Sequence, residues 1–497
     1  MRTLLLFLLL GGAAGAQDLL VISPKPFWEA AKEWRAHREA QGHAIAFREP
    51  AEDLPKLVRE VAAGGRLRSV LLLGDMHHVG CAYHEGVFIR PYERDFRIAT
   101  DHPLSDLDGD NLPDLAVGRI PADNPDEARA MLGRIVAYER SRDFGAWRRR
   151  VNVFAGVGGF GALQDWALEQ VARKFLTENV GLDFDLHVTY ANPSSPFCPP
   201  PARVGETMLE RFNEGALAVA YLGHGSRNHL DRVAYGGRRF DILPEEAVYS
   251  IDCKRGPPIA IFVACSTGHF DGAPDCLAEH ALRQPRGPVA VIASSRVSMP
   301  YANGVLGKEL LDALFLQRLP TLGEVWVQAK RRLVAAAEGD AGRQFIEMLA
   351  MGYQMREDLR TQERAEHLYL YHLFGDPAMR LPLPRAATIE PLATSRPGST
   401  VTITGSAPVE GAALAELLHA RSAPRAARAD DSDAGFRACY EKANDWVRAS
   451  AKGRVANGRF AIELALPKDL PPGPHPIRLF VEGSDGAASA AAQITIE

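Results

Sequence analysis

Two short apolar stretches, ALAVAYL at 216–222 and IAIFVA at 259–264, each run into a residue that can carry chemistry. The first is followed by Gly-His-Gly with His224 in the middle, and the second is followed directly by Cys265. A short apolar run bounded by turn residues is typical of a buried strand in a parallel sheet. Because α/β proteins place their chemistry at the carboxyl ends of such strands, we expect His224 and Cys265 to face one cleft. A nearby imidazole lowers the pKa of a thiol and generates the thiolate that a cysteine nucleophile needs.

Strand-like and helix-like patterns alternate on both sides of these stretches, and the alternation restarts near residue 150. It predicts an α/β fold built as two side-by-side parallel-sheet subdomains, A at 17–149 and B, the catalytic one, at 150–384. Prolines then mark a linker, and segments of period two separated by Gly and Pro follow. These segments predict a C-terminal immunoglobulin-like β-sandwich at 385–497.

The N-terminus and the overall composition limit where the protein works and what it binds. Residues 1–16 combine a positive start, a short apolar core and an Ala-x-Ala site, which predicts a signal peptide cleaved after Ala16. We therefore expect a secreted, periplasmic or cell-surface protein with no membrane span. A net charge of −5 without a dense basic patch argues against nucleic-acid binding. Six cysteines in 497 residues are too few for a disulfide scaffold.

The spacing of His224 and Cys265 favours catalysis over a purely structural role. His224 precedes Cys265 by 41 residues, an order that resembles the one in caspases. The flanking glycines allow close backbone approach, and the amide of Gly225 could donate to an oxyanion, as could the amide of Cys265. The alternative interpretation is a buried cysteine and a hydrogen-bonded histidine without chemistry.

Several segments resemble the gingipain family of cysteine peptidases. The resemblance implies a caspase-like fold and an exported cysteine endopeptidase that hydrolyses proteins or peptides, with His224 as base and Cys265 as nucleophile. The alternative is a catalytically silent homologue that acts in surface assembly or binding. The matching segments, in chain order, are 106–120, 221–226 (YLGHGS), 263–268 (VACSTG), 289–295 (VAVIASS) and 374–377 (FGDP).

An acidic loop places Asp106, Asp108, Asp110 and Asp114 at relative positions 1, 3, 5 and 9. Alternate side chains of a tight loop can converge on one cation, so the spacing predicts a structural calcium site. Position 12 is Val117 rather than an acid, and a hydrated turn stabilised by local hydrogen bonds is the alternative.

No organic cofactor is predicted. The glycine pattern at 156–161 fits a dinucleotide-binding turn, but Asp183 and Asp185 precede or begin the next strand instead of ending it. A zinc site built from His77, His78, His84 and Cys81 fits no standard ligand spacing.

Asp101 lies just before the acidic loop. In gingipains that cleave after Arg or Lys, an acid in the matching segment lies in the primary specificity pocket, so the resemblance implies that Asp101 binds a basic substrate side chain. The alternative is a local turn or helix-capping role. A carboxylate that orients His224 is also implied, and Asp75, Glu85 and Glu93 are the candidates.

Overall fold

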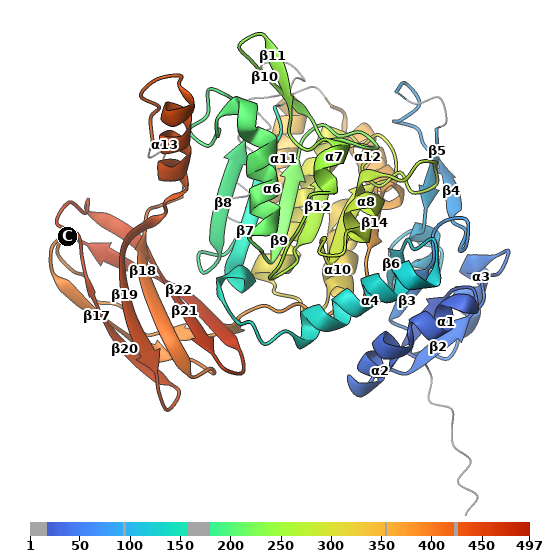
Figure 1. The fold of residues 1–497 in the computed structure, drawn as a ribbon, viewed down its shortest axis with the longest axis horizontal. Coiled ribbons are helices and arrows are strands. Elements are labelled where there is room, and N and C mark those ends of the chain that lie inside the picture. Colours follow the sequence, from blue (N-terminus) through green and yellow to red (C-terminus); the bar gives the residue numbers. More distant parts are fainter. Residues whose placement is uncertain (1–16, 93–95, 158–178, 353–354, 422–425) are drawn as a thin grey trace, which may run out of the picture.

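The computed structural model describes residues 17–92, 96–157, 179–352, 355–421 and 426–497 (Figure 1). The predicted signal peptide, residues 1–16, lies outside the described residues. Among the residues that are described, no helix is both long and apolar enough to cross a membrane.

A single ten-stranded sheet forms the centre of the α/β part. Its strands follow the spatial order β2-β1-β3-β6-β14-β13-β12-β9-β7-β8. Their bounds are β1 (Leu19–Ile22), β2 (Ile45–Arg48), β3 (Ser69–Leu73), β6 (Ala116–Ile120), β7 (Arg150–Ala155), β8 (Asp185–Tyr190), β9 (Ala218–Leu222), β12 (Ile259–Val263), β13 (Ala290–Ser294) and β14 (Tyr371–Phe374). The predicted α/β class is confirmed, and the two predicted subdomains share one sheet.

The direction of the strands reverses in the middle of the sheet. All neighbouring strands pair in parallel except β13 and β14, which are antiparallel. The carboxyl ends of β3 and β6 therefore lie at one edge of the sheet, and those of β9 and β12 at the opposite edge. The second edge is the one that carries His224 and Cys265.

Helices and two hairpins surround the sheet. Helix ends are fixed by side chains where the sequence provides them: Asp53 caps α3, Asn124 caps α4, and Thr321 with Glu324 forms a capping box on α10. The helices are α1 (Pro26–Ala30), α2 (Lys32–Ala40), α3 (Leu54–Ala62), α4 (Pro125–Arg140), α6 (Val204–Asn213), α7 (Glu245–Val248), α8 (Leu277–Arg283), α9 (Pro300–Leu311), α10 (Leu322–Val334), α11 (Ala341–Gly352) and α12 (Glu357–Leu370). The hairpins are β4 (Ala82–Glu85) with β5 (Arg97–Thr100), and β10 (Arg232–Tyr235) with β11 (Arg238–Asp241).

The C-terminal part consists of two β-sheets around a separate apolar core that includes Ile403, Leu417, Ile462 and Leu479. Its β-rich character is as predicted, and the immunoglobulin type stays a prediction. The first sheet holds β15 (Arg385–Ala386), β22 (Ala487–Ile496), β21 (Gly473–Gly483), β18 (Gly411–Leu418) and β19 (Val447–Val455). The second holds β16 (Thr388–Ile389), β17 (Thr400–Ser406) and β20 (Arg459–Ala465).

Helix α13 (Asp433–Asn444) extends from this C-terminal part to β8, the edge strand of the central sheet (Figure 1). The Asn444 side chain accepts from the Val188 amide at 2.8 Å and donates to the Val188 carbonyl at 2.9 Å. The Trp446 indole donates to the Leu186 carbonyl at 2.7 Å. These hydrogen bonds satisfy backbone groups on the outer side of β8, which an uncovered edge strand would leave unpaired.

Candidate active site

His224 and Cys265 lie at equivalent positions after two adjacent strands. Strands β9 and β12 pair in parallel, with Leu222 opposite Val263 at the end of the register. Each reactive residue follows two positions beyond that pair, and both are partly buried. The register therefore brings the two residues to the same sheet edge, and the contact of their side chains stays a prediction.

Gly225 allows the two chain segments to approach closely. A Cβ atom at this position would lie 2.9 Å from the carbonyl oxygen of Cys265 and 2.9 Å from the Cβ of Ala264, so a larger residue would push the segments apart. The Tyr221 hydroxyl donates to the carbonyl of His224 at 2.8 Å and fixes the backbone on the other side. Residues beside a nucleophile are expected to be rigid, and these are held on both sides.

The turn after Cys265 has an unusual backbone. Ser266 has a φ of 57°, in the left-handed region that residues with a side chain seldom adopt. Its amide donates to the carbonyl of Arg296 at 2.9 Å. The buried Arg296 guanidinium in turn donates to both carboxylate oxygens of Asp271, each at 2.7 Å. Burial acts to raise the pKa of Asp271, but the hydrogen bonds from Arg296 hold it below its ordinary value. This ion pair ties the segment after Cys265 to the segment after β13.

Ser298, which the sequence analysis did not single out, contacts the sulfur of Cys265. Its amide donates to Sγ at 3.4 Å, and the thiol can donate to its carbonyl at 3.4 Å. Ser298 lies just before α9, so the positive end of that helix dipole is close to the sulfur. A helix N-terminus stabilises a negative charge placed beside it.

Helix α12 supports the start of α9 from behind. The Met299 amide donates to His367 Nε2 at 3.0 Å, and the Ala302 amide donates to the Glu363 carboxylate at 2.9 Å. Burial lowers the pKa of His367 to about 4 and raises the pKa of Glu363 to about 7. His367 is therefore neutral at pH 7 and can accept the Met299 hydrogen bond.

Asp101 is buried and already has a cationic partner. Its carboxylate accepts hydrogen bonds from Arg119 at 2.9 and 2.7 Å, and the Arg119 side chain is fully buried. Burial acts to lower the pKa of Arg119, and Asp101 holds it above its ordinary value. The predicted contact of Asp101 with a basic substrate side chain stays a prediction, but the pair with Arg119 gives Asp101 a structural role of its own.

The acidic loop brings three of its four predicted carboxylates together. Carboxylate oxygens of Asp106, Asp108 and Asp114 lie within 4.8 Å of one another, and Asp110 is not in this group. Asp110 instead accepts from the Leu112 amide at 2.7 Å. The three grouped carboxylates also accept hydrogen bonds from the loop backbone, so the geometry fits a cation and fits the local-turn alternative as well.

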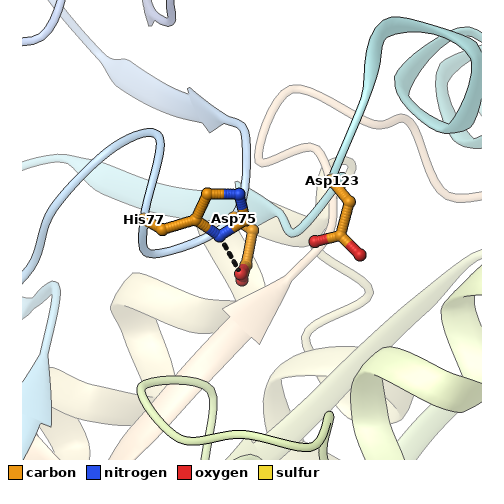
Figure 2. A group of neighbouring side chains, drawn as sticks. All are labelled: Asp75, His77 and Asp123. Atoms are coloured by element: carbon orange, nitrogen blue, oxygen red, sulfur yellow. Dashed lines mark hydrogen bonds and ion pairs between the residues drawn. The ribbon is translucent and has the colours of Figure 1, made fainter.

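A second group of possible metal ligands consists of Asp75, His77 and Asp123. Figure 2 shows the ring of His77 bonded to Asp75, with Asp123 beside the pair; the Nδ1 to Oδ2 distance is 2.8 Å. Asp75 follows β3 and Asp123 follows β6, so the group lies at the edge opposite the catalytic one. Asp123 is also paired with Arg283 at 3.0 Å, which already neutralises its charge.

The residues considered for zinc do not form one site. His78 bonds to the Asp123 carbonyl at 2.8 Å, whereas His84 stacks on Tyr369 with ring centroids 3.8 Å apart. Burial raises the pKa of Cys81 to about 12, which disfavours the thiolate that a metal requires.

Two of the three carboxylates considered for orienting His224 have other partners. Asp75 bonds His77, and Glu85 pairs with Arg90 at 3.3 Å. Glu93 lies outside the described residues, as does most of the glycine pattern at 156–161. The one described glycine of that pattern that closely approaches a neighbour is Gly156, where a Cβ would lie 2.7 Å from the Tyr221 hydroxyl.

A cysteine and a histidine at neighbouring strand ends are the pair of residue types that cysteine-dependent hydrolases use. Residues 13–382 match Peptidase family C25, and the chain belongs to this family. The resemblance to gingipains that the sequence motifs indicated is thereby confirmed.

Similar proteins agree with this assignment. The chain is 23% identical over 264 residues to gingipain R2 of Porphyromonas gingivalis, a match that covers 52% of this chain and 32% of that protein. It is 29% identical over 218 residues to an uncharacterized protein of Archaeoglobus fulgidus, covering 41% of this chain and 48% of the other. The match thus spans about a third of the length of gingipain R2.

Among solved structures, the Arg specific cysteine proteinase gingipain R superposes with a TM-score of 0.57 at 19% identity, covering 97% of this chain and 98% of that one. A complex of the pro- and mature domains of RgpB from Porphyromonas gingivalis superposes with a TM-score of 0.54 at 17% identity, covering 97% of this chain and 100% of the other. These structures establish a gingipain-type fold.

Proposed function

We propose that this protein is an exported cysteine endopeptidase that uses Cys265 as nucleophile and His224 as general base. The observation that carries the proposal is the register of β9 and β12, which places both residues at the same point beyond paired strand ends. The contact of Ser298 with the sulfur and the close approach of Gly225 to Cys265 support it. Both reactive residues of the family motifs are intact, which disfavours the silent-homologue alternative.

The chemistry follows from these roles. The Cys265 thiol gives its proton to a ring nitrogen of His224, and the sulfur attacks the carbonyl carbon of the scissile bond. The oxyanion of the tetrahedral intermediate accepts hydrogen bonds from the amides of Gly225 and Cys265. His224 then returns the proton to the leaving amine, and water hydrolyses the remaining thioester with His224 again as base.

Cleavage after basic residues is a finer part of the proposal. The superposed gingipain R is described as Arg specific, and Asp101 is the residue that the sequence motif assigns to such a preference. Asp101 is paired with Arg119, so a basic substrate side chain would share the Asp101 carboxylate with that arginine. Export rests on the signal peptide pattern at residues 1–16.

The proposal is tested by replacing the nucleophile. The Cys265→Ala variant should lose peptide hydrolysis completely and keep its melting temperature, and iodoacetamide should modify Cys265 of the wild-type chain near neutral pH. Cys81 is the matched control, because burial raises its thiol pKa to about 12 and it should resist modification. Full activity of Cys265→Ala on a casein or peptide substrate would refute the assignment.

A further inference from the structure

The sulfur of Cys265 is contacted by Ser298, a residue that has no part in the His224 mechanism. Three polar groups of Ser298 surround it. The amide nitrogen lies 3.4 Å from Sγ, the hydroxyl oxygen 3.9 Å, and the carbonyl oxygen 3.4 Å. The first two groups can donate a hydrogen bond and the third can only accept one, so the set can serve both the thiolate and the thiol.

Asn303 and Tyr371 fix the direction of the Ser298 hydroxyl. The Asn303 amide nitrogen donates to Ser298 Oγ at 2.8 Å, and its amide oxygen accepts from the Tyr371 hydroxyl at 2.7 Å. The Tyr371 oxygen also lies 3.2 Å from Ser298 Oγ. Because Asn303 donates to the serine oxygen and Tyr371 donates to Asn303, the hydrogen of the Ser298 hydroxyl can be donated to the Cys265 sulfur or to the Tyr371 oxygen, and a thiolate is the more strongly attracting acceptor of the two. Ser298 and Tyr371 are both buried, which limits competition from water.

We propose that Ser298 positions and stabilises the Cys265 thiolate, with Asn303 and Tyr371 holding Ser298 in place; the inference rests on the proposed peptidase function of Cys265. In the neutral state the thiol donates to the Ser298 carbonyl. Once the proton has moved to His224, the thiolate accepts from the amide and the hydroxyl of Ser298. The anion is stabilised by two neutral donors, so no additional charged side chain is needed beside the scissile bond.

Other titratable groups near the sulfur leave this role to Ser298. Burial raises the pKa of Tyr221 and of Tyr371, so both stay neutral at the pH of the reaction. Glu363 has a pKa raised by burial to about 7, but it bonds the Ala302 amide rather than Ser298. Among the residues that the structure describes, the titratable or charged groups around this segment also include His224 after β9, Asp231 before β10, His269, Asp271 and Arg296 beside the Cys265 turn, and His367 on α12.

The experiment measures how fast iodoacetamide alkylates Cys265 between pH 4 and pH 9 in the full chain, with the Cys265 peptide quantified by mass spectrometry. Ser298→Ala removes one hydrogen bond to the thiolate and so makes the thiolate less stable. At any pH below the alkylation midpoint, the fraction of Cys265 present as thiolate should fall by about tenfold, and the midpoint should rise. Ser298→Thr keeps a hydroxyl and should restore the wild-type midpoint. Asn303→Ala and Tyr371→Phe should raise the midpoint by less, and kcat should fall in all three deficient variants with little change in KM.

The matched control is Tyr301→Phe. Tyr301 also lies in the first turn of α9, but its hydroxyl bonds Glu347 at 2.6 Å and receives a bond from Arg364. Tyr301→Phe should keep the wild-type alkylation midpoint. Glu363→Gln should keep it as well, because Glu363 bonds the Ala302 amide and not Ser298. Midpoints that coincide in wild type, Ser298→Ala and Asn303→Ala would overturn the proposal. If Ser298→Ala does not fold, Tyr371→Phe is the deciding variant: a raised alkylation midpoint supports the proposal, and an unchanged midpoint overturns it. The two proposals can fail separately. If the wild-type chain has no peptidase activity but Ser298→Ala still shifts the alkylation midpoint, the proposed function is refuted and the role of Ser298 stands.

Discussion

Asp101 and Arg119 form a two-point ion pair in the interior of the α/β part, with nitrogen to oxygen distances of 2.9 and 2.7 Å. Asp101 is 5% exposed and Arg119 is fully buried, and Arg119 also donates to the carbonyls of Val79 and Gly80. The guanidinium therefore fixes the segment between β3 and β4 as well as Asp101. A carboxylate that the sequence motif assigns to substrate is thus part of the internal structure.

This pair makes a prediction about Asp101→Asn. Breaking a buried ion pair leaves an uncompensated charge, so the variant should lose about 3 kcal/mol of stability in denaturant unfolding. The exposed pair Arg35 with Glu39 provides the control, since Glu39→Gln should cost less than about 1 kcal/mol. A peptide library digested in parallel by the wild type and by Asp101→Asn then distinguishes the two roles of Asp101. An unchanged preference at the cleaved residue supports the structural role, and a preference for Arg or Lys that collapses in the variant supports the pocket role.

His224→Ala should reduce kcat/KM by about 10²–10⁴-fold, the usual contribution of a positioned general base. Two other histidines can be tested as alternative bases, one close in sequence to His224 and one close in sequence to Cys265. His229 bonds Ser226 at 2.7 Å, and His269 lies 3.5 Å from Asp271. Their alanine variants should keep most of the activity in a steady-state assay. A near-normal rate for His224→Ala together with a large loss for His229→Ala would move the base to His229.

The acidic loop is predicted to bind calcium for stability rather than for chemistry. A chelator should lower the melting temperature of the wild-type chain, and added calcium should restore it by mass action. Double replacement of Asp106 and Asp108 by Asn should abolish that response. Asp110→Asn is the matched control and should keep it, because Asp110 lies outside the carboxylate group. Melting curves of the wild type that coincide with and without chelator would leave the loop a hydrogen-bonded turn.

Glu279 makes stability depend on pH. It lies in the first turn of α8, accepts from the Cys276 amide at 2.8 Å, and is almost fully buried. Burial raises its pKa to about 8, and the nearby Asp75 carboxylate adds to the increase. The folded state holds this proton more tightly than the unfolded state does. The resulting stability is complete below the unfolded pKa and is lost as the pH rises through about 8.

Thermal unfolding from pH 5 to pH 9 tests this. The wild type should lose stability across the range, and Glu279→Gln should show a flatter profile because a neutral amide has no proton to lose. Glu324→Gln is the control, since Glu324 occupies the same capping position on α10 but is exposed. A wild-type profile as flat as that of Glu279→Gln would contradict the prediction.

The sequence by itself determined the parts of this protein that depend on local pattern. Short apolar runs bounded by glycine or proline indicate β9 and β12, because such runs are typical of buried strands in a parallel sheet, and the residues after them then fall at one sheet edge. The motifs around His224 and Cys265 sufficed for the family. The C-terminal strands were predictable for the same reason, since period-two alternation reports directly which side of a strand is buried.

Tertiary structure decided what depends on which distant side chains meet. The strand β14 follows β6 by about 250 residues of sequence, yet it pairs with β6 and with β13, joins the two halves and reverses the strand direction. Ser298 contacts Cys265 although 33 residues of sequence separate them, and Asp101 forms an ion pair with Arg119 of β6. Hydrophobic periodicity records how deeply a residue is buried but not the partner it finds there. Burial makes an unpaired charge or donor costly, so these pairings are settled by the packing of whole elements rather than by any local run of residues.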